Sequence, residues 1–438
     1  MADSLISRLD TTQADFKERF HRLCHWDEGN LVAVEKRVSE IVARIRNQGD
    51  GALVDLTRRF DRLELTPETL EFSEAEIDQA ISQAPDDELA ALELAAKRIR
   101  SYHEWQMPPM GVQQYQDESG TTLGQRTTAL DRAGLYVPGG LASYPSSVLM
   151  NAIPAKVAGV EELIMTVPTP DGVANPLILA AARISGVDRV FRVGGAQAIA
   201  AMAYGTATIP SVDKIVGPGN IYVAIAKRQV FGQVGIDMIA GPSEILVIAD
   251  KENDPAWIAA DLLSQAEHDE IAQSVLITDD ADFADAVEVA LEAHLKVLSR
   301  SAISRISLAS RGAIILASDL EEACRLASQL APEHLELALT DPERYLPLIH
   351  HAGAIFMGRH TPEAMGDYVA GPNHVLPTSG TARFSSPLGV YDFIKRTSLI
   401  HCTPDSLKVI GPAASTLAAS EGLTAHKLSV DIRLKGDV

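Results

Sequence analysis

Hydrophobic residues in the first third of this 438-residue chain recur at helical spacing. The clearest run is Leu31, Val34, Val38, Ile41 and Ile45. This pattern predicts helices from residue 1 to about residue 60, with a break at Gly49 to Gly51, and we interpret them as an arm and a packing surface. The spacing is again helical from Ser73 to about Trp105, where Pro85 is expected to separate two helices that cover a sheet.

From Arg132 onward the pattern changes to short apolar runs of strand length that alternate with helices. The predicted strands are Leu163 to Val167, Val190 to Val193 and Lys214 to Val216. One helix is expected to begin at Pro176, capped by Asn175, and another to run from Ala196 to Tyr204. This βαβαβ order predicts a parallel sheet with helices on its faces.

A second alternating set of elements follows. Its predicted strands are Glu244 to Ala249, Ser274 to Thr278, Gly312 to Leu316, a short run around Leu337, and Ala354 to Met357. The helices between them are expected at Pro255 to His268, Asp282 to Leu298 and Leu320 to Leu330. The predicted fold class is therefore α/β, with two parallel-sheet units of incomplete Rossmann type.

This order of elements also predicts a division into domains, which a chain of this length is expected to have. The predicted parts are a helical arm (1–30), an α/β domain formed by 31–131 and 240–382, an inserted α/β domain (132–239), and a C-terminal tail (383–438). A helix is expected in the tail at Ala413 to Ala425.

Two predicted strands of the inserted unit end in glycine-rich turns, Gly194-Gly195-Ala-Gln197 and Gly217-Pro-Gly-Asn220. Glycine lets a backbone approach a phosphate, and a following helix N-terminus supplies N–H groups. However, no Gly-x-Gly-x-x-Gly follows a predicted strand, so the usual dinucleotide fingerprint is absent. The turns suggest a nucleotide, but tight turns without a ligand would explain them equally well.

The composition excludes several classes of protein. The formal charge of −21, from 38 basic and 59 acidic residues, disfavours binding to nucleic acid or to acidic membranes. No apolar run has the length of a membrane span, and the N-terminus lacks the features of a signal peptide, so we expect a cytoplasmic protein. The three cysteines, Cys24, Cys324 and Cys402, lie too far apart to indicate a disulfide framework or a thiolate metal cluster.

The predicted helix that begins at Pro255 has polar side chains on one face, although most of its residues are apolar. Asp261, Gln265 and His268 fall on one face, with Asp254 as the expected cap. An amide oxygen and an imidazole nitrogen three residues apart can both bind a borderline metal such as zinc. A solvated helix end is the alternative.

Three further segments pair carboxylates with imidazoles. Glu333 and His334 lie at the start of a short strand, where histidine suits proton transfer near neutral pH and an ionised carboxylate can activate water. Asp367 and His374 lie on a loop rich in small residues, and the carboxylate could be a third metal ligand. In the tail, Glu421 and His426 flank Gly422, which is expected to loosen the helix. Each pair could instead be an ordinary strand cap, turn or helix end.

Taken together, the ordered motifs from Arg132 onward resemble histidinol dehydrogenase. They are Gly-Leu-Tyr-Val-Pro-Gly-Gly140, Val-Gly-Gly-Ala-Gln-Ala-Ile199, Gly-Pro-Gly-Asn220, Ala-Gly-Pro-Ser-Glu244, Asp-Leu-Leu-Ser-Gln-Ala-Glu-His268, Pro-Glu-His334, Gly-Asp-Tyr368, Gly-Pro-Asn-His374, Ala-Arg-Phe-Ser-Ser386 and Leu-Thr-Ala-His426. Residues 1 to about 110 match only loosely.

The resemblance implies an NAD-linked, zinc-containing enzyme that oxidises histidinol through histidinal to histidine, in the last steps of histidine biosynthesis. It implies the zinc ligands Gln265, His268, Asp367 and His426. The implied NAD contacts are Tyr136, Gln197 and Asn220. Ser243, His374 and Glu421 would join the zinc ligands and His334 in the substrate site. Glu333 and His334 would be the acid/base groups.

The resemblance also implies an intertwined homodimer in which the tail completes the partner's site, so that His426 is a ligand in trans. No motif carries a cysteine, so water is expected as the nucleophile of the second oxidation. Three alternatives stay open: a zinc hydrolase, a non-catalytic protein that binds a small amine, and a related zinc/NAD-dependent dehydrogenase of another amino alcohol.

Overall fold

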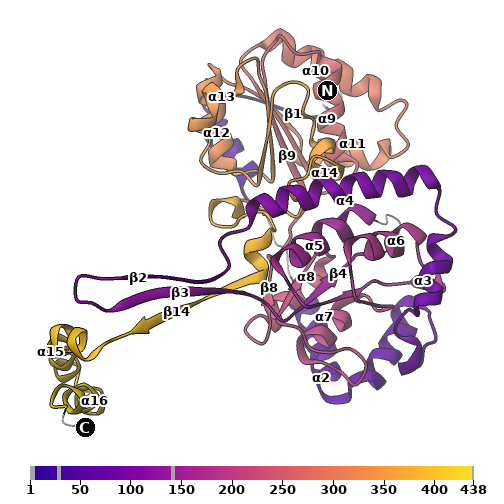
Figure 1. The fold of residues 1–438 in the computed structure, drawn as a ribbon. Coiled ribbons are helices and arrows are strands. Elements are labelled where there is room, and N and C mark those ends of the chain that lie inside the picture. Colours follow the sequence, from indigo (N-terminus) through magenta and orange to yellow (C-terminus); the bar gives the residue numbers. More distant parts are fainter. Residues whose placement is uncertain (1–4, 27–30, 140–143, 437–438) are drawn as a thin grey trace.

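The structure is a computed structural model that describes residues 5–26, 31–139 and 144–436. Gly140, the last residue of one motif quoted above, lies outside this part, as do both ends of the predicted helical arm (1–30). Two parallel sheets lie one above the other, and a long antiparallel arm leaves their junction (Figure 1). The predicted α/β class is confirmed.

The five-stranded sheet has the order β6-β5-β4-β7-β8, and all its strands are parallel. Its strands are β4 (Arg132–Tyr136), β5 (Glu162–Thr166), β6 (Arg189–Phe191), β7 (Lys214–Val216) and β8 (Gly235–Ile236). Its crossover helices are α5 (Pro145–Ala158), α6 (Pro176–Ser185), α7 (Gly195–Tyr204) and α8 (Ile221–Val230). Asn175 caps α6 as predicted, because its side chain accepts the Leu177 N–H at 2.8 Å. The strand order reverses between β4 and β7, and such a switch point favours a ligand site at the strand carboxyl ends.

The six-stranded sheet has the order β1-β11-β10-β9-β12-β13 and is also parallel. Its strands are β1 (Ser7–Asp10), β9 (Glu244–Ala249), β10 (Gln273–Thr278), β11 (Ala313–Leu316), β12 (His334–Ala338) and β13 (Ala354–Met357). The helices of this unit are α1 (Phe16–Cys24), α9 (Pro255–Ala266), α10 (Ala281–His294), α11 (Ser301–Arg311), α12 (Leu320–Leu330), α13 (Pro342–Tyr345) and α14 (Glu363–Tyr368). The helical interpretation of the N-terminus is wrong at β1, where four residues pair with β11 and bury the Leu9 side chain. So short a strand has no periodicity of its own that the sequence could reveal.

Three helices from the first quarter of the chain cover the five-stranded sheet. They are α2 (Val32–Asp61), α3 (Glu74–Ile81) and α4 (Asp86–Gln106). Pro85 separates α3 from α4 as predicted. The predicted break at Gly49 is also present, because the backbone there is non-helical (φ +53°, ψ −132°) and kinks α2. Because α2 packs on α7 and α8, and α4 packs on α5, this packing argues for grouping these helices with residues 132–239. The domain boundaries stay a prediction.

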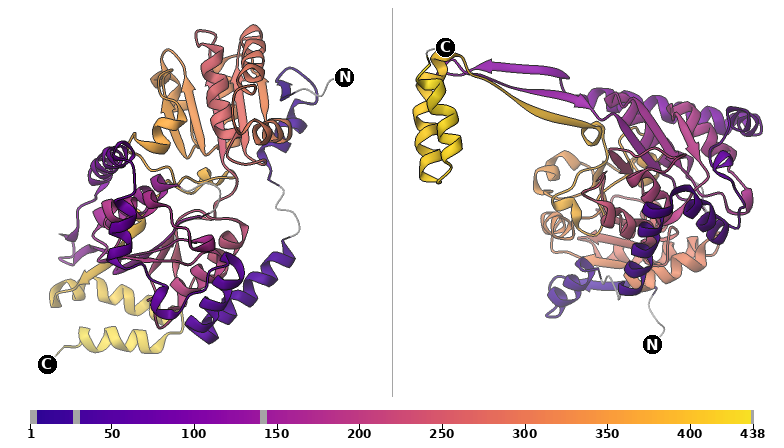
Figure 2. Two further views of the ribbon diagram at one scale, coloured as in Figure 1. Left: turned by 90° about the vertical axis from the view of Figure 1, so that its right-hand side faces the viewer. Right: turned by 90° about the horizontal axis from the view of Figure 1, so that it is seen from below.

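The arm consists of an antiparallel sheet that the sequence pattern did not predict. It joins β2 (Gly111–Gln116), β3 (Thr122–Ala129) and β14 (Ile394–His401) in the order β14-β3-β2. At its end lie α15 (Pro404–Ser420) and α16 (Thr424–Leu434), far from both parallel sheets (Figures 1 and 2). Gly422, at φ +72°, separates the two helices, so the predicted loosening is confirmed. The expected tail helix begins nine residues earlier than predicted, at Pro404.

Short 3-10 helices complete the described elements: Pro67–Thr69, Pro170–Gly172, Leu346–Leu348, Thr381–Arg383 and Val390–Phe393. Within the described part of the chain, no helix has both the length and the apolar character needed to cross a membrane.

Candidate active site

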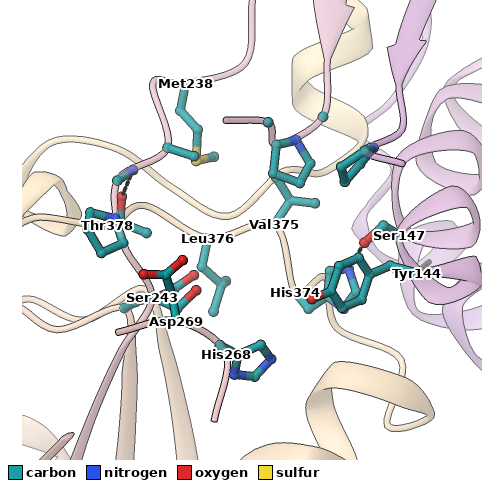
Figure 3. Close-up of a pocket in the computed structure, with 18 of the residues that line it drawn as sticks. Tyr144, Ser147, Met238, Ser243, His268, Asp269, His374, Val375, Leu376 and Thr378 are labelled. Atoms are coloured by element: carbon teal, nitrogen blue, oxygen red, sulfur yellow. Dashed lines mark hydrogen bonds between the residues drawn. The ribbon is translucent and has the colours of Figure 1, made fainter. Parts of the chain in front are cut away.

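A cavity of about 560 Å³ lies between the two parallel sheets. The carboxyl end of the five-stranded sheet contributes Pro138 and the turn 217–220 to its lining. The amino end of the six-stranded sheet contributes Ser243, Glu333 and His334. Figure 3 shows side chains from both units pointing into this space. The opposed sheet edges therefore bring together residues as far apart in the chain as Pro138 and Thr378.

Helix α9 places the first candidate metal ligands. Asp254 caps the helix by accepting the Ala256 N–H at 2.8 Å, as predicted. Gln265 is fully buried, and its side-chain amide donates to His268 Nδ1 at 3.3 Å. Its Oε1 atom is buried without a hydrogen-bond partner, which is costly for an amide oxygen. A metal ion would satisfy this oxygen, so the donor set fits one.

Asp367 lies in α14 and faces the same cavity as Gln265 and His268. Burial opposes ionisation of this carboxyl, but the neighbouring His334 imidazole lowers its pKa. Single ligand atoms of His334, Glu363 and Asp367 lie within 4.8 Å of one another. An ionised carboxylate is therefore available next to the α9 pair as a further metal ligand.

The first residue of β12 is His334, and its ring has a defined hydrogen pattern. Nδ1 lies 3.0 Å from the carbonyl oxygen of Glu244. A carbonyl can only accept, so Nδ1 carries the hydrogen. Nε2 is buried without a hydrogen-bond partner and lies 3.6 Å from Asp367 Oδ1. When the ring is neutral, Nε2 presents a free lone pair beside the candidate metal ligands, as a general base requires.

Glu333 precedes His334 and is also buried. Its Oε2 atom accepts the Glu244 N–H at 2.9 Å and lies 3.6 Å from His334 Nδ1. Burial raises the pKa of Glu333 to about 8, so the carboxyl exchanges its proton near neutral pH rather than staying ionised as expected from its type. Burial opposes charge on His334 too, but the Glu363 and Glu333 carboxylates raise its pKa well above its ordinary value. The two groups therefore form a pair that holds and exchanges protons near neutral pH.

The structure also places His374 and Ser243 at the cavity. His374 Nδ1 lies 2.7 Å from the backbone oxygen of Asp367, and Nε2 lies 3.1 Å from Ser147 Oγ (Figure 3). Burial lowers the pKa of His374, so the ring is neutral and accepts from the serine hydroxyl. This bond connects α5 of the five-stranded unit to the loop after α14, which carries His374. Asp367 itself lies in α14 and not on the loop predicted from the sequence.

Sequence reasoning missed two side chains of this site. Ser147 stands in a stretch that was noted only for its change of pattern. Glu363 is 2% exposed, and its Oε1 lies 3.4 Å from His334 Nδ1. Its one sequence signal is a position four residues before Asp367 on a helix, which puts both side chains on one face.

The three predicted NAD contacts divide into two groups. Asn220 lines the cavity, and its Oδ1 caps α8 by accepting the N–H groups of Tyr222 and Val223 at 3.0 and 3.3 Å. Tyr136 and Gln197 are buried and do not line the cavity. Tyr136 accepts the Gly195 N–H at 3.1 Å, so it braces the glycine turn after β6.

Glu421 and His426 do not reach the cavity of their own chain. Both are exposed on the tail at the end of the arm (Figure 2). None of the three cysteines lines the cavity either. Burial raises the pKa of Cys24 and of Cys324 to about 11, which disfavours a reactive thiolate at either position.

A comparison with protein families shows to which family the chain belongs. The family model described as histidinol dehydrogenase matches residues 26–434. The chain belongs to the histidinol dehydrogenase family. The histidinol dehydrogenase of Ruegeria pomeroyi is 61% identical over 426 residues, which cover 97% of this chain and 98% of that protein. The one from Rhodospirillum rubrum is 60% identical, with 98% of each chain covered.

The fold agrees with that of a solved member of the family. The crystal structure of histidinol dehydrogenase from Elizabethkingia anophelis matches with a TM-score of 0.93 and 35% sequence identity, and 99% of each chain is covered. The resemblance found in the sequence is thereby confirmed. It also extends over the N-terminal helices, which matched only loosely at the level of motifs. Membership of the histidinol dehydrogenase family makes the chain an oxidoreductase.

Proposed function

We propose that this protein oxidises L-histidinol through L-histidinal to L-histidine, with two molecules of NAD used in turn at one zinc-containing site. The observation that carries the proposal is the convergence of Gln265, His268 and Asp367 with the Glu333–His334 pair in a single cavity. A glycine-rich turn at the switch point of a parallel sheet forms the opposite wall. Candidate metal ligands, a pair of groups that exchange protons and a glycine-rich turn therefore share one space.

Four residues would hold the zinc: Gln265, His268 and Asp367 from one chain and His426 from a second copy. The unpartnered Gln265 Oε1 supports this set, because a buried amide oxygen without a partner is unusual. When bound, zinc would orient the imidazole and amine of the substrate. Ser243, His374 and Glu421 would complete the substrate site.

In the first oxidation, His334 Nε2 would accept the hydroxyl proton while the hydride passes to NAD. In the second, water adds to the aldehyde carbonyl, and Glu333 would take the proton that this water releases. The hydrate then loses its hydride to a second NAD and gives the carboxylic acid. The position of His334 between two carboxyls fits repeated uptake and release of protons.

The nucleotide side of the proposal rests on the turn 217–220. It follows β7 and leads into α8, whose N-terminus presents N–H groups and the positive end of the helix dipole. Asn220 would contact NAD directly. Tyr136 and Gln197 are buried and would act by supporting the glycine-rich turns rather than by contacting NAD.

We further propose that the protein is a homodimer in which the tail of each chain completes the site of the other. Helix α16 has no buried residue in a single chain. Its exposed fractions are 60% for Leu428 and 56% for Ile432, and Leu417 on α15 is 63% exposed. An apolar face on a two-helix tail of this kind favours a covering partner, and the candidate ligand His426 lies on the same tail.

The test of the activity is NADH formation over a panel of amino alcohols, with metal content measured on the same sample. We expect two NADH per L-histidinol and little or no NADH from the other amino alcohols. NADH from another amino alcohol alone would identify a related dehydrogenase. Binding without turnover would identify a binding protein, and hydrolysis that needs no NAD would identify a hydrolase.

The metal assignment gives a separate expected outcome. His268→Asn or His426→Asn should lower bound zinc and activity together, because each removes one ligand atom from a four-ligand set. Zinc per chain is measured after dialysis against a weak chelator. The matched control is His350→Asn, an exposed histidine outside the cavity, which should keep full zinc and activity. Full zinc content in both ligand variants would contradict the assignment.

A further inference from the structure

A buried ion pair lies beside the turn 217–220, and both of its residues are part of the cavity lining. The Lys227 ammonium, on α8, meets the Asp237 carboxylate, which follows β8. Their side chains are 3% and 1% exposed. A buried ion pair loses the hydration of both charges, so it is weak evidence for stability and calls for another explanation.

Both members of the pair also bind the backbone of one residue in the turn. Lys227 Nζ donates to the carbonyl oxygen of Gly217 at 2.9 Å. Asp237 Oδ2 accepts the N–H of the same glycine at 2.8 Å. The pair thus holds the two polar backbone groups of Gly217, and it links the ends of β7 and β8 to α8.

Gly217 adopts a backbone conformation that only glycine fits at this position. Its φ angle is +113°, a region that side chains other than glycine rarely adopt. A Cβ atom built on it would lie 2.1 Å from the carbonyl oxygen of Tyr136. The turn is therefore packed closely against the end of β4, and the ion pair binds the same glycine through its N–H and its carbonyl oxygen.

We propose that Lys227 and Asp237 are positioning residues for the dinucleotide. They fix the turn 217–220 in the shape in which Asn220 and the N-terminus of α8 can receive NAD. This inference rests on the proposed use of NAD. The Lys227 ammonium already faces a carboxylate and a carbonyl, so its role is to hold the turn rather than to contact the ligand.

The deciding variant is Lys227→Met/Asp237→Asn. It removes both charges together, so no unpaired buried charge remains, and the new amide can still accept the Gly217 N–H. The bond to the Gly217 carbonyl is lost. We expect a melting temperature near that of the wild type, but a dissociation constant for NAD at least about tenfold higher, as misplaced binding groups produce. NAD binding is measured by calorimetry without substrate, next to zinc content and the KM values for NAD and histidinol.

The matched control is Lys214→Met. Lys214 is the first residue of β7 and pairs with Asp392 at 2.8 Å, whereas the turn 217–220 follows the other end of this strand. It should leave NAD affinity unchanged. Wild-type affinity in the double variant would overturn the inference and leave a role in stability only. An equal loss in the Lys214 control would also overturn it.

Two further outcomes distinguish a failure of the positioning role from a failure of the proposed function. If the wild type does not bind or reduce NAD, the proposed function fails, whatever the variants do. If the double variant does not fold, Lys227→Met alone takes its place, because it removes the bond to the Gly217 carbonyl and keeps the bond from the Gly217 N–H to Asp237. A raised KM for NAD with an unchanged KM for histidinol is then expected, and an unchanged KM for NAD would overturn the inference.

Discussion

Replacing His334 by Asn is expected to lower the rate of both oxidations by about two to four orders of magnitude, the usual contribution of a positioned general base. The reason is geometric. Nε2 of His334 is a buried nitrogen without a hydrogen-bond partner beside the candidate metal ligands, and Nδ1 is held by the Glu244 carbonyl. Single-turnover NADH formation, measured from histidinol and from histidinal separately, checks the prediction.

The neighbouring carboxyl should behave differently in the same assay. Glu333→Gln keeps the size of the side chain but cannot accept a proton, so it should slow oxidation of histidinal more than oxidation of histidinol. Zinc content is measured in His334→Asn and in Glu333→Gln, because a loss of bound zinc would also slow either oxidation. Equal slowing of both steps by Glu333→Gln would show that the carboxyl positions His334 rather than activates water.

The second large effect is recovery of activity from two inactive proteins. His268→Asn and His426→Asn are each expected to be inactive alone. If His426 acts across the dimer interface, a heterodimer holds one site with both defects and one intact site. Random subunit exchange makes about half of all dimers heterodimers, so about one quarter of wild-type activity should return.

Exchange itself is verified with two affinity tags, so that a lack of recovery can be interpreted. Exchange without any return of activity would place the tail in its own chain's site. The control is a mixture of His268→Asn with Asp367→Asn, two changes within one chain's site. Neither heterodimer site is then intact, and no activity should return.

The sequence by itself determined the regular parts of this protein. Alternating apolar runs predicted eight of the eleven parallel strands in the described part of the chain, β9 among them. Helical spacing predicted the helices whose periodicity was long enough, such as α9. Local caps such as Asn175 and Asp254 were readable because capping depends on a few adjacent residues. The motifs around Gln265, Glu333 and Asp367 identified the family and named the residues of the candidate site.

Only the tertiary structure decided how these parts meet. Strand β1, and β14 of the arm, pair with residues hundreds of positions away, and such pairing leaves no local signal. The same is true of Glu363 beside His334 and of the Lys227–Asp237 pair, since burial and charge partners arise from packing alone. The raised pKa of Glu333 is a further case, because the desolvation that causes it comes from two sheet edges that close over one carboxyl.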